Sequence, residues 1–194
     1  MTEEVLSMSN QRIFRVRRSL LRLSGSLVFA AASAPAIAKL TMPVKAIGRD
    51  AYMAHLHTAE KIDVVYAVDN QYVDPVLAKL NHFLRDHYSH EVGVMDPRLY
   101  DLMHQIRRDL GARGAFDVIS GYRSPSTNER LRVTGGGGVA KRSLHMDGKA
   151  IDLRLPGVPL SELRDAAIAQ QQGGVGYYPR DQFVHIDTGK VRFW

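Results

Sequence analysis

Two histidines and one aspartate in the last third of the sequence have the types and spacing of a metal site. His145 and Asp152 lie seven positions apart in the segment SLHMDGKAID, and His185 lies in the segment FVHID. Zinc held by three protein ligands of these types keeps one of its four tetrahedral positions open, which distinguishes a catalytic site from a closed structural one. This set therefore predicts metal-assisted attack of water on a polarised carbonyl group.

Short strands are expected to carry two of these three side chains. In FVHID, strand alternation places His185 and Asp187 on the same face. In KAIDLRL, the same alternation turns Asp152 away from the face of its apolar neighbours. If the two strands are adjacent, Asp152 and His185 converge. His145 then arrives from the preceding turn, where Gly148 allows the backbone to fold back.

The rest of the pattern predicts both helices and strands. Asp74 and Asp96 are each followed by proline, and apolar residues then recur at helical spacing, so a helix is expected to begin at each aspartate. A third helix is expected over PLSELRDAAIAQQQ, with Gly173 as its stop. Strands are expected at residues 62–68, 116–120, 149–155, 175–178 and 183–187.

Two segments between these elements are expected to be loops. Gly121 and Pro125 interrupt GYRSPSTNERLR, so this stretch is expected to lack regular structure. The glycine run 135–138 indicates a surface loop, and it lacks the Gly-Lys-Ser/Thr ending of a phosphate-binding loop, which argues against nucleotide binding. The whole pattern predicts a single α+β domain with a mainly antiparallel central sheet flanked by helices.

The N-terminal segment differs in composition from the rest of the chain. A basic stretch precedes an uncharged run of 16 residues, Leu23 to Ala38, which ends in Ala-Ile-Ala. This is the pattern of a cleaved signal peptide, and the run is shorter than the roughly 20 apolar residues of a membrane span. The Arg17-Arg18 pair resembles a twin-arginine export signal, with an ordinary secretory signal as the alternative. We expect a signal peptide at 1–38 and one exported domain at 39–194, with membrane attachment only through an uncleaved signal.

Composition narrows the classes of partner and of chemistry. The net charge is +6, and half of it belongs to the predicted signal peptide. The remaining mild excess suits an anionic polymer outside the cytoplasm, and no basic block with interleaved aromatic residues indicates a nucleic acid partner. The chain has no cysteine. This excludes disulfides and a thiol nucleophile, and it restricts any zinc ligands to histidines and carboxylates.

The ordered motifs together resemble a known clan of peptidases. The pattern S-x-H-x-x-G-x-A-x-D, followed by GGVGYYP and FVHIDTGKVRFW, is similar to the zinc D-Ala-D-Ala peptidase clan, which also contains VanX-type dipeptidases, L-Ala-D-Glu endolysins and the hedgehog signalling domain. HTAEKIDVVY, SGYRSPSTNERLR and VAKRSLHMDGKAIDLRLPGV resemble the exported murein endopeptidase K branch, over residues 56–194. The resemblance implies a hedgehog-like, D,D-peptidase-like fold and a Zn²⁺ ion bound by His145, Asp152 and His185.

The same resemblance implies two further catalytic residues. Arg123 falls where the clan uses an arginine to hold the polarised carbonyl oxygen, and the alternative is that it only braces its loop. Many clan members have a glutamate or aspartate three residues before the last histidine, but this chain has Gln182, whose amide cannot accept a proton. Asp187 is then the candidate general base, with orientation of His185 as an equal alternative, and Asp181 is a third candidate base.

These expectations describe an exported zinc metallopeptidase of the periplasm or cell wall. Its predicted partners are peptidoglycan stem peptides and cross-links, and the branch resemblance implies cross-links that contain meso-diaminopimelate. The alternative is a non-catalytic zinc module that binds the wall or a protein, which the amide at position 182 keeps open. The histidine pairs in HLHT and HYSH have no third ligand at matching spacing and are expected to be structural or surface residues.

Overall fold

The computed structural model describes residues 48–134 and 139–194 of the chain. All of these residues lie in one compact unit, in agreement with the expected single domain. The predicted signal peptide and the predicted glycine loop at 135–138 lie outside the described residues. Within the described ranges, no helix is long and apolar enough to cross a bilayer.

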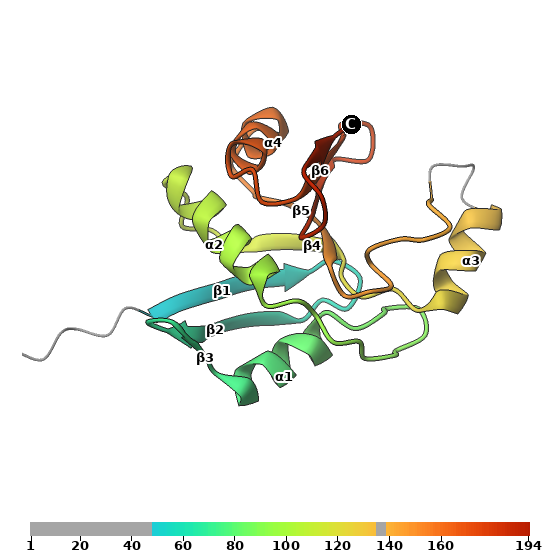
Figure 1. The fold of residues 1–194 in the computed structure, drawn as a ribbon, viewed down its shortest axis with the longest axis horizontal. Coiled ribbons are helices and arrows are strands. Elements are labelled where there is room, and N and C mark those ends of the chain that lie inside the picture. Colours follow the sequence, from blue (N-terminus) through green and yellow to red (C-terminus); the bar gives the residue numbers. More distant parts are fainter. Residues whose placement is uncertain (1–47, 135–138) are drawn as a thin grey trace, which may run out of the picture. The chain divides into compact units, whose positions relative to one another are not determined.

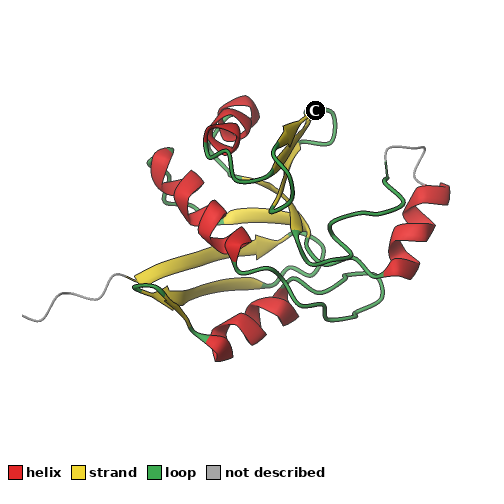
Figure 2. Ribbon diagram, viewed as in Figure 1, coloured by secondary structure: helices red, strands yellow, loops and turns green. Residues whose placement is uncertain are grey.

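Both helices and strands are formed by the described residues (Figures 1 and 2). The strands are β1 (Gly48–His55), β2 (Lys61–Val68), β3 (Gln71–Tyr72), β4 (Phe116–Ser120), β5 (Ala150–Arg154), β6 (Gly174–Tyr178), β7 (Phe183–Asp187) and β8 (Arg192–Phe193). The helices are α1 (Asp74–Phe83), α2 (Arg98–Asp109), α3 (Pro125–Thr134) and α4 (Leu160–Ala169). The α+β class is therefore confirmed, as are the helices expected after Asp74, after Asp96 and in the segment PLSELRDAAIAQQQ.

One mixed sheet joins all of these strands, in the order β3-β2-β1-β4-β5-β7-β6-β8. β1 pairs with β4 in parallel, and so do β6 and β8, whereas the other neighbours are antiparallel. The expectation of a mainly antiparallel sheet is corrected to a mixed sheet. Parallel neighbours need a long crossover connection, and the chain supplies one between β1 and β4 through α1 and α2.

Three helices pack on this sheet and close a single hydrophobic core. α1 contacts β2, α2 contacts β1, and α4 contacts β6 and β7 (Figure 1). The buried side of α2 carries the apolar residues that recur at helical spacing, among them Leu99, Leu102 and Ile106. They join Ile151 and Leu153 from β5 in the core. The backbone of β5, which carries Asp152, is thus fixed by apolar neighbours on both sides of that residue.

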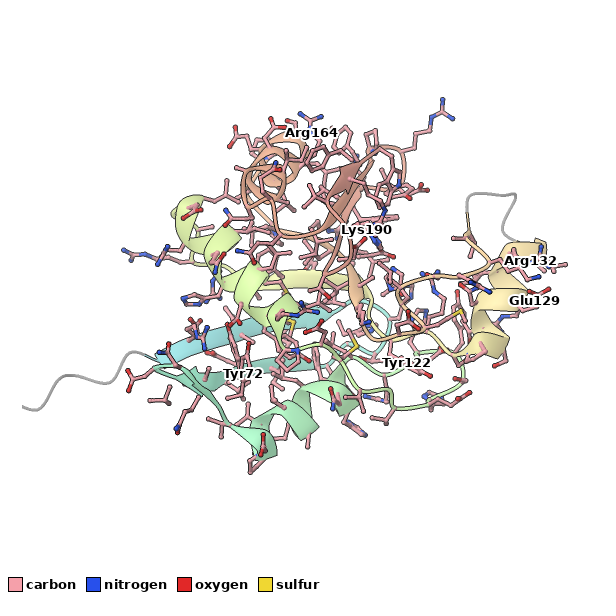
Figure 3. The ribbon with its side chains drawn as sticks, viewed as in Figure 1. Tyr72, Tyr122, Glu129, Arg132, Arg164 and Lys190 are labelled. Carbon is pink, nitrogen blue, oxygen red and sulfur yellow. The ribbon has the colours of Figure 1, made fainter. Side chains whose placement is uncertain are left out.

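The segment after β4 contains a helix where the sequence pattern predicted a loop. α3 begins at Pro125, and the Thr127 N–H donates a hydrogen bond to the Ser124 hydroxyl at 3.2 Å. Serine before a proline in the first helical turn is a helix start, because the hydroxyl satisfies a free N–H and proline needs no partner there. Glu129 and Arg132 pair on its exposed side at 2.6 Å (Figure 3). The expectation of a loop throughout GYRSPSTNERLR was therefore wrong, because Pro125 starts a helix there instead of breaking one.

Three histidine rings cluster at the end of β1. His55 is 1% exposed, and its Nδ1 accepts a hydrogen bond from the His57 N–H at 3.2 Å. The His57 and His87 rings stack with centroids 4.1 Å apart, and the His55 ring meets His87 edge-on at 5.7 Å. Burial, and then the neighbouring imidazoles, lower the pKa of His55 to about 4, and burial likewise lowers that of His87 to about 4. The His55 and His87 rings are therefore neutral at neutral pH, and the cluster is structural.

This cluster predicts acid-sensitive stability. An unfolded histidine gains its proton near pH 6.5. Between about pH 6.5 and 4 the unfolded chain therefore binds more protons than the folded one, and the free energy of unfolding falls as the pH falls. His55→Asn keeps an acceptor near the Nδ1 position but cannot titrate. We expect it to reduce the stability lost between pH 7 and pH 5 by about 1 to 2 kcal/mol.

Urea unfolding at the two pH values measures this effect. His90→Asn is the matched control, because His90 is exposed and its φ of +61° is a backbone conformation that asparagine tolerates. The control is expected to keep the wild-type pH dependence. An unchanged pH dependence in His55→Asn as well would contradict the assignment.

Candidate metal centre

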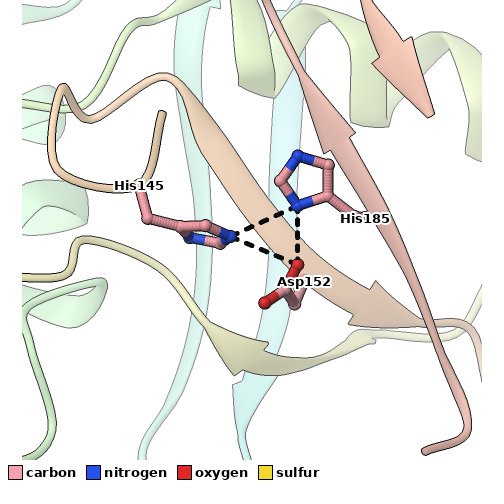
Figure 4. A group of neighbouring side chains, drawn as sticks. All are labelled: His145, Asp152 and His185. Atoms are coloured by element: carbon pink, nitrogen blue, oxygen red, sulfur yellow. Dashed lines mark hydrogen bonds and ion pairs between the residues drawn. The ribbon is translucent and has the colours of Figure 1, made fainter. Parts of the chain in front are cut away.

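The three predicted ligand residues meet at one point of the sheet. Asp152 on β5 lies directly opposite His185 on β7 in the antiparallel pair. The Asp152 Oδ1 atom lies 2.8 Å from His185 Nδ1 and 3.3 Å from His145 Nε2, and these two nitrogens are 3.2 Å apart (Figure 4). All three residues are buried, and they form the one group of three or more potential metal ligands found among the described residues.

A tight turn before β5 brings His145 to this point. The Gly148 backbone has a φ of +65°, and a Cβ atom there would overlap the carbonyl oxygen of Val94. Glycine is thus required both by conformation and by space, as the sequence predicted for the turn. The His145 Nδ1–H donates to the carbonyl oxygen of Gly121 at 2.8 Å, which leaves Nε2 facing Asp152. The turn is a loop in Figure 2 and is tied to the loop before α2, because the Asp96 N–H donates to the Gly148 carbonyl.

Asp187 holds the second histidine from the opposite side. The His185 Nε2–H lies 3.2 Å from Asp187 Oδ2, so His185 presents its Nδ1 to the centre. Asp187 is 0% exposed. Its oxygens also accept hydrogen bonds from the N–H groups of Gly174 and Gly189, at 3.0 and 2.8 Å, and from the Arg192 guanidinium at 3.1 and 2.7 Å. Both oxygens of the Asp187 carboxylate are therefore engaged in hydrogen bonds within the protein.

The electrostatics of the centre favour an anionic carboxylate beside a cation. Burial raises the pKa of Asp152, but the charge of His145 and hydrogen bonds from both histidines outweigh burial and hold that pKa well below its usual range. Burial lowers the pKa of His185, whereas hydrogen bonds to Asp152 and Asp187 raise it, to about 9. Burial raises the pKa of Asp187, and its bonds to His185 and Arg192 then lower it below the usual range. A positive charge at this point is thus strongly stabilised.

The donor set fits a zinc ion in type, number and spacing. Zinc prefers imidazole nitrogen and carboxylate oxygen at about 2.0 to 2.2 Å in tetrahedral geometry, which sets ligand atoms roughly 3.3 Å from one another. The three separations of 2.8, 3.2 and 3.3 Å found here are close to that value. Each histidine also has its second ring nitrogen bound to a carbonyl or a carboxylate, as metal-binding histidines almost always do.

Arg123 lies beside this centre. Its guanidinium is 3.6 Å from Asp152 Oδ2 and donates to the Ser120 hydroxyl at 3.3 Å, and its side chain is 13% exposed. The Arg123 backbone N–H also bonds to the carbonyl oxygen of His145 at 3.2 Å. The predicted arginine and the predicted ligands are therefore brought together, and the guanidinium still faces open space.

Two cavities open on either side of Arg123. The larger has a volume of about 460 Å³ and contains His145, Asp152 and His185 in its wall. The smaller has a volume of about 200 Å³ and lies against the histidine cluster. Arg123, Asp152 and Phe183 line both cavities, so the two cavities adjoin beside the metal centre, and we refer to them together as the groove.

The larger cavity contains residues that the sequence argument did not single out. Trp194 lies against His185, with ring centroids 5.3 Å apart, and its indole N–H donates to the Tyr178 hydroxyl at 2.8 Å. The Arg192 guanidinium lies over the Trp194 ring at 4.8 Å while it binds Asp187. A Cβ atom at Gly176 would collide with the indole. The only signal was their place in FVHIDTGKVRFW, because no spacing rule predicts that β8 returns beside β6.

The other predicted residues are dispersed. Gln182 turns its side-chain amide to the carbonyl oxygen of Pro179 at 2.5 Å and is exposed. Asp181, its neighbour, lines the larger cavity, whereas Asp187 lines neither cavity. Two tyrosines outside this predicted set also line the cavities, Tyr178 the larger one and Tyr122 the smaller one.

Comparisons with known proteins find relatives that match most of this chain. A family model described as "Peptidoglycan L,D-endopeptidase MepK" matches residues 45–194. A protein of Escherichia coli (strain K12) with that same name is 44% identical over 179 residues, which are 92% of this chain and 96% of that protein. A protein of Haemophilus influenzae named "Probable peptidoglycan L,D-endopeptidase MepK" is 42% identical over 141 residues, which are 72% of this chain and 75% of that protein.

Proposed function

Because this chain belongs to the family of peptidoglycan L,D-endopeptidases called MepK, we propose that it hydrolyses peptide cross-links of peptidoglycan with a zinc ion held by His145, Asp152 and His185. The observation that carries the proposal is the triangle of ligand atoms, 2.8 to 3.3 Å on a side, in the wall of one cavity and next to a second cavity that shares Asp152 and Arg123. An endopeptidase needs space next to its reacting centre for both arms of the substrate, since the substrate continues on both sides of the bond.

The metal and the arginine have separate tasks in this proposal. A bound zinc ion lowers the pKa of water and polarises a carbonyl group. Arg123 faces the groove beside Asp152 and is placed to hold the carbonyl oxygen as it gains negative charge. A guanidinium fixed in that position stabilises the charge most where it is greatest, in the transition state.

Asp187 is assigned the role of positioning His185. Its burial and its five hydrogen bonds support this role over that of a general base, because a base must reach the attacking water. The bond to the His185 Nε2–H fixes the ring so that Nδ1 faces the metal site. Arg192 balances the charge of the buried Asp187 carboxylate. Strand β8, which carries Arg192, thus also helps to hold His185 in position.

Asp187→Asn separates the two roles. If Asp187 positions His185, the Asp187→Asn variant is expected to bind zinc about 10- to 100-fold more weakly. Its activity should then return when the zinc concentration is raised by a similar factor. A general base would instead leave zinc bound while kcat falls by about 10² to 10⁴ at every zinc concentration. Competitive zinc titration and cleavage assays on one preparation measure both. Asp165→Asn, at an exposed position of α4, is the control and should change neither.

Cleavage of defined cross-linked muropeptides tests the proposed function itself. The zinc-loaded protein is expected to cut the dimers, a chelator to stop the reaction, and added zinc to restore it. Zinc bound without any cleavage would instead support the non-catalytic wall-binding module. That alternative is not favoured, because the relatives that match most of this chain are named as endopeptidases.

We further propose that the chain acts outside the cytoplasm, where peptidoglycan lies. The supporting features are the basic start and uncharged run of residues 1–38, with the Arg17-Arg18 pair of a twin-arginine signal. Residues 39–194 are then the exported enzyme. N-terminal sequencing of the protein from a periplasmic extract tests this assignment, and a start near Lys39 is the expected result.

A further inference from the structure

One arginine in the larger cavity has no partner among the described residues. Three arginines line this cavity. Arg123 lies against Asp152 and Ser120, and Arg192 is bound to Asp187 through both of its terminal nitrogens. Arg142 is exposed, and it makes no hydrogen bond or ion pair with the described parts of the chain. It precedes the turn that carries His145, and among the described residues it is the unpaired arginine of the cavity whose wall contains the metal centre.

The two cavities differ in the charge that they can bind. The larger one offers Arg142 together with an apolar wall of Leu144, Tyr178 and Trp194, and its one carboxylate outside the ligand triangle is Asp181. The smaller one shares Arg123 but contributes no other arginine or lysine, and it adds the carboxylate of Asp86 to a wall that includes His57 and Tyr122. A substrate arm that carries a free carboxylate next to the scissile bond is therefore better matched by the larger cavity, and the other arm by the smaller one.

We propose that Arg142 binds the free carboxylate on the residue that supplies the nitrogen of the scissile amide. This inference rests on the proposed function, and it sets the direction of the substrate in the groove. In a cross-link through diaminopimelate, the carbon that carries the amide nitrogen also carries a carboxylate. The carboxylate thus stands close to the reacting carbonyl, and Arg142 lines the same cavity as His145. Arginine can meet a carboxylate with two parallel hydrogen bonds, so the pair also orients the amide.

A pair of substrates that differ in one group tests the proposal. One muropeptide dimer carries this carboxylate, and the other carries a carboxamide in its place. The zinc-loaded wild type is expected to prefer the carboxylate form by roughly fivefold to 30-fold in kcat/KM, the range for a partly exposed ion pair of about 1 to 2 kcal/mol. The preference should appear as a difference in KM and not in kcat, because the ion pair between Arg142 and the carboxylate forms equally in the bound substrate and in the transition state.

Variants of Arg142 should change the preference in a graded way. Arg142→Gln is expected to bring the two substrates within about twofold of each other, Arg142→Lys to keep part of the preference, and Arg142→Glu to reverse it. Lys141→Gln is the matched control, because Lys141 is the adjacent exposed cation and does not line the cavity. It should keep the full wild-type preference. Added salt should weaken the preference of the wild type.

Two results would overturn the inference. One is a wild type that cleaves both dimers equally well, and the other is an Arg142→Gln variant that keeps the wild-type preference. Failure to cleave either dimer would contradict the proposed function instead. Equilibrium titration of the same two dimers into the same zinc-loaded proteins then decides the role of Arg142 without turnover: tighter binding of the carboxylate form that is lost in Arg142→Gln supports it, and equal binding refutes it.

Discussion

Asp152→Asn is expected to abolish both zinc binding and peptidase activity. The carboxylate is the only anionic member of the ligand triangle and touches both histidines, at 2.8 and 3.3 Å. A neutral amide of the same size removes the charge that attracts the ion and leaves two imidazoles at the site. Loss of the metal removes several kcal/mol of transition-state stabilisation, so kcat/KM should fall by about 10³-fold or more. Metal analysis and muropeptide cleavage on the same sample measure the two losses.

A control is available on the neighbouring strand. Asp117 on β4 also lies in the sheet and pairs with Arg154 at 3.0 Å, but it is not part of the ligand triangle. Asp117→Asn is expected to keep about one zinc per chain and activity within about twofold of the wild type. Near-stoichiometric zinc and full activity in folded Asp152→Asn would refute the assigned ligand set.

Arg123→Gln should damage catalysis without removing the metal. Arg123 lies between the two cavities and beside the metal centre, and the loss of one donor to a developing oxyanion costs about 10² to 10³ in kcat. KM and zinc content are expected to change much less. Steady-state kinetics with metal analysis distinguish this result from that of Asp152→Asn.

The alternative for Arg123 is a purely structural role. Arg123 bonds to Ser120 and approaches Asp152, so it also braces its own loop against β4 and β5. If bracing were its main task, Arg123→Gln would lower the urea midpoint while kcat stayed near that of the wild type. Arg130→Gln serves as the comparison, since Arg130 on α3 lies over the Tyr88 ring at 4.1 Å and lines neither cavity. Its kcat should remain within about twofold of the wild type.

The convergence of His145, Asp152 and His185 could be predicted from the sequence because it depends largely on local rules. Strand alternation placed Asp152 on the face of its strand opposite its apolar neighbours and placed His185 on one face with Asp187, and Gly148 marked the turn that carries His145. The sequence argument had to assume that β5 and β7 are neighbours, because strand pairing is a long-range property that local patterns do not predict. In the structure the two strands are paired, with Asp152 opposite His185.

Other features depended on contacts that no local pattern encodes. The parallel pairing of β1 and β4 follows from the path of two helices, so the sequence pattern indicated strands but not their direction. The start of α3 was missed although Ser124 and Pro125 form a helix-start signal, because proline was interpreted only as a breaker. The burial of Asp187 beneath Arg192 depends on the return of β8 to the sheet.

Anomalous X-ray diffraction at the zinc absorption edge, from crystals of the zinc-loaded protein, is the most direct test of the central claim. We expect one strong anomalous peak about 2.0 to 2.2 Å from His145 Nε2, Asp152 Oδ1 and His185 Nδ1, with no fourth protein ligand. A protein that binds zinc stoichiometrically but shows its peak elsewhere, or that shows no peak between these three side chains, would contradict the account.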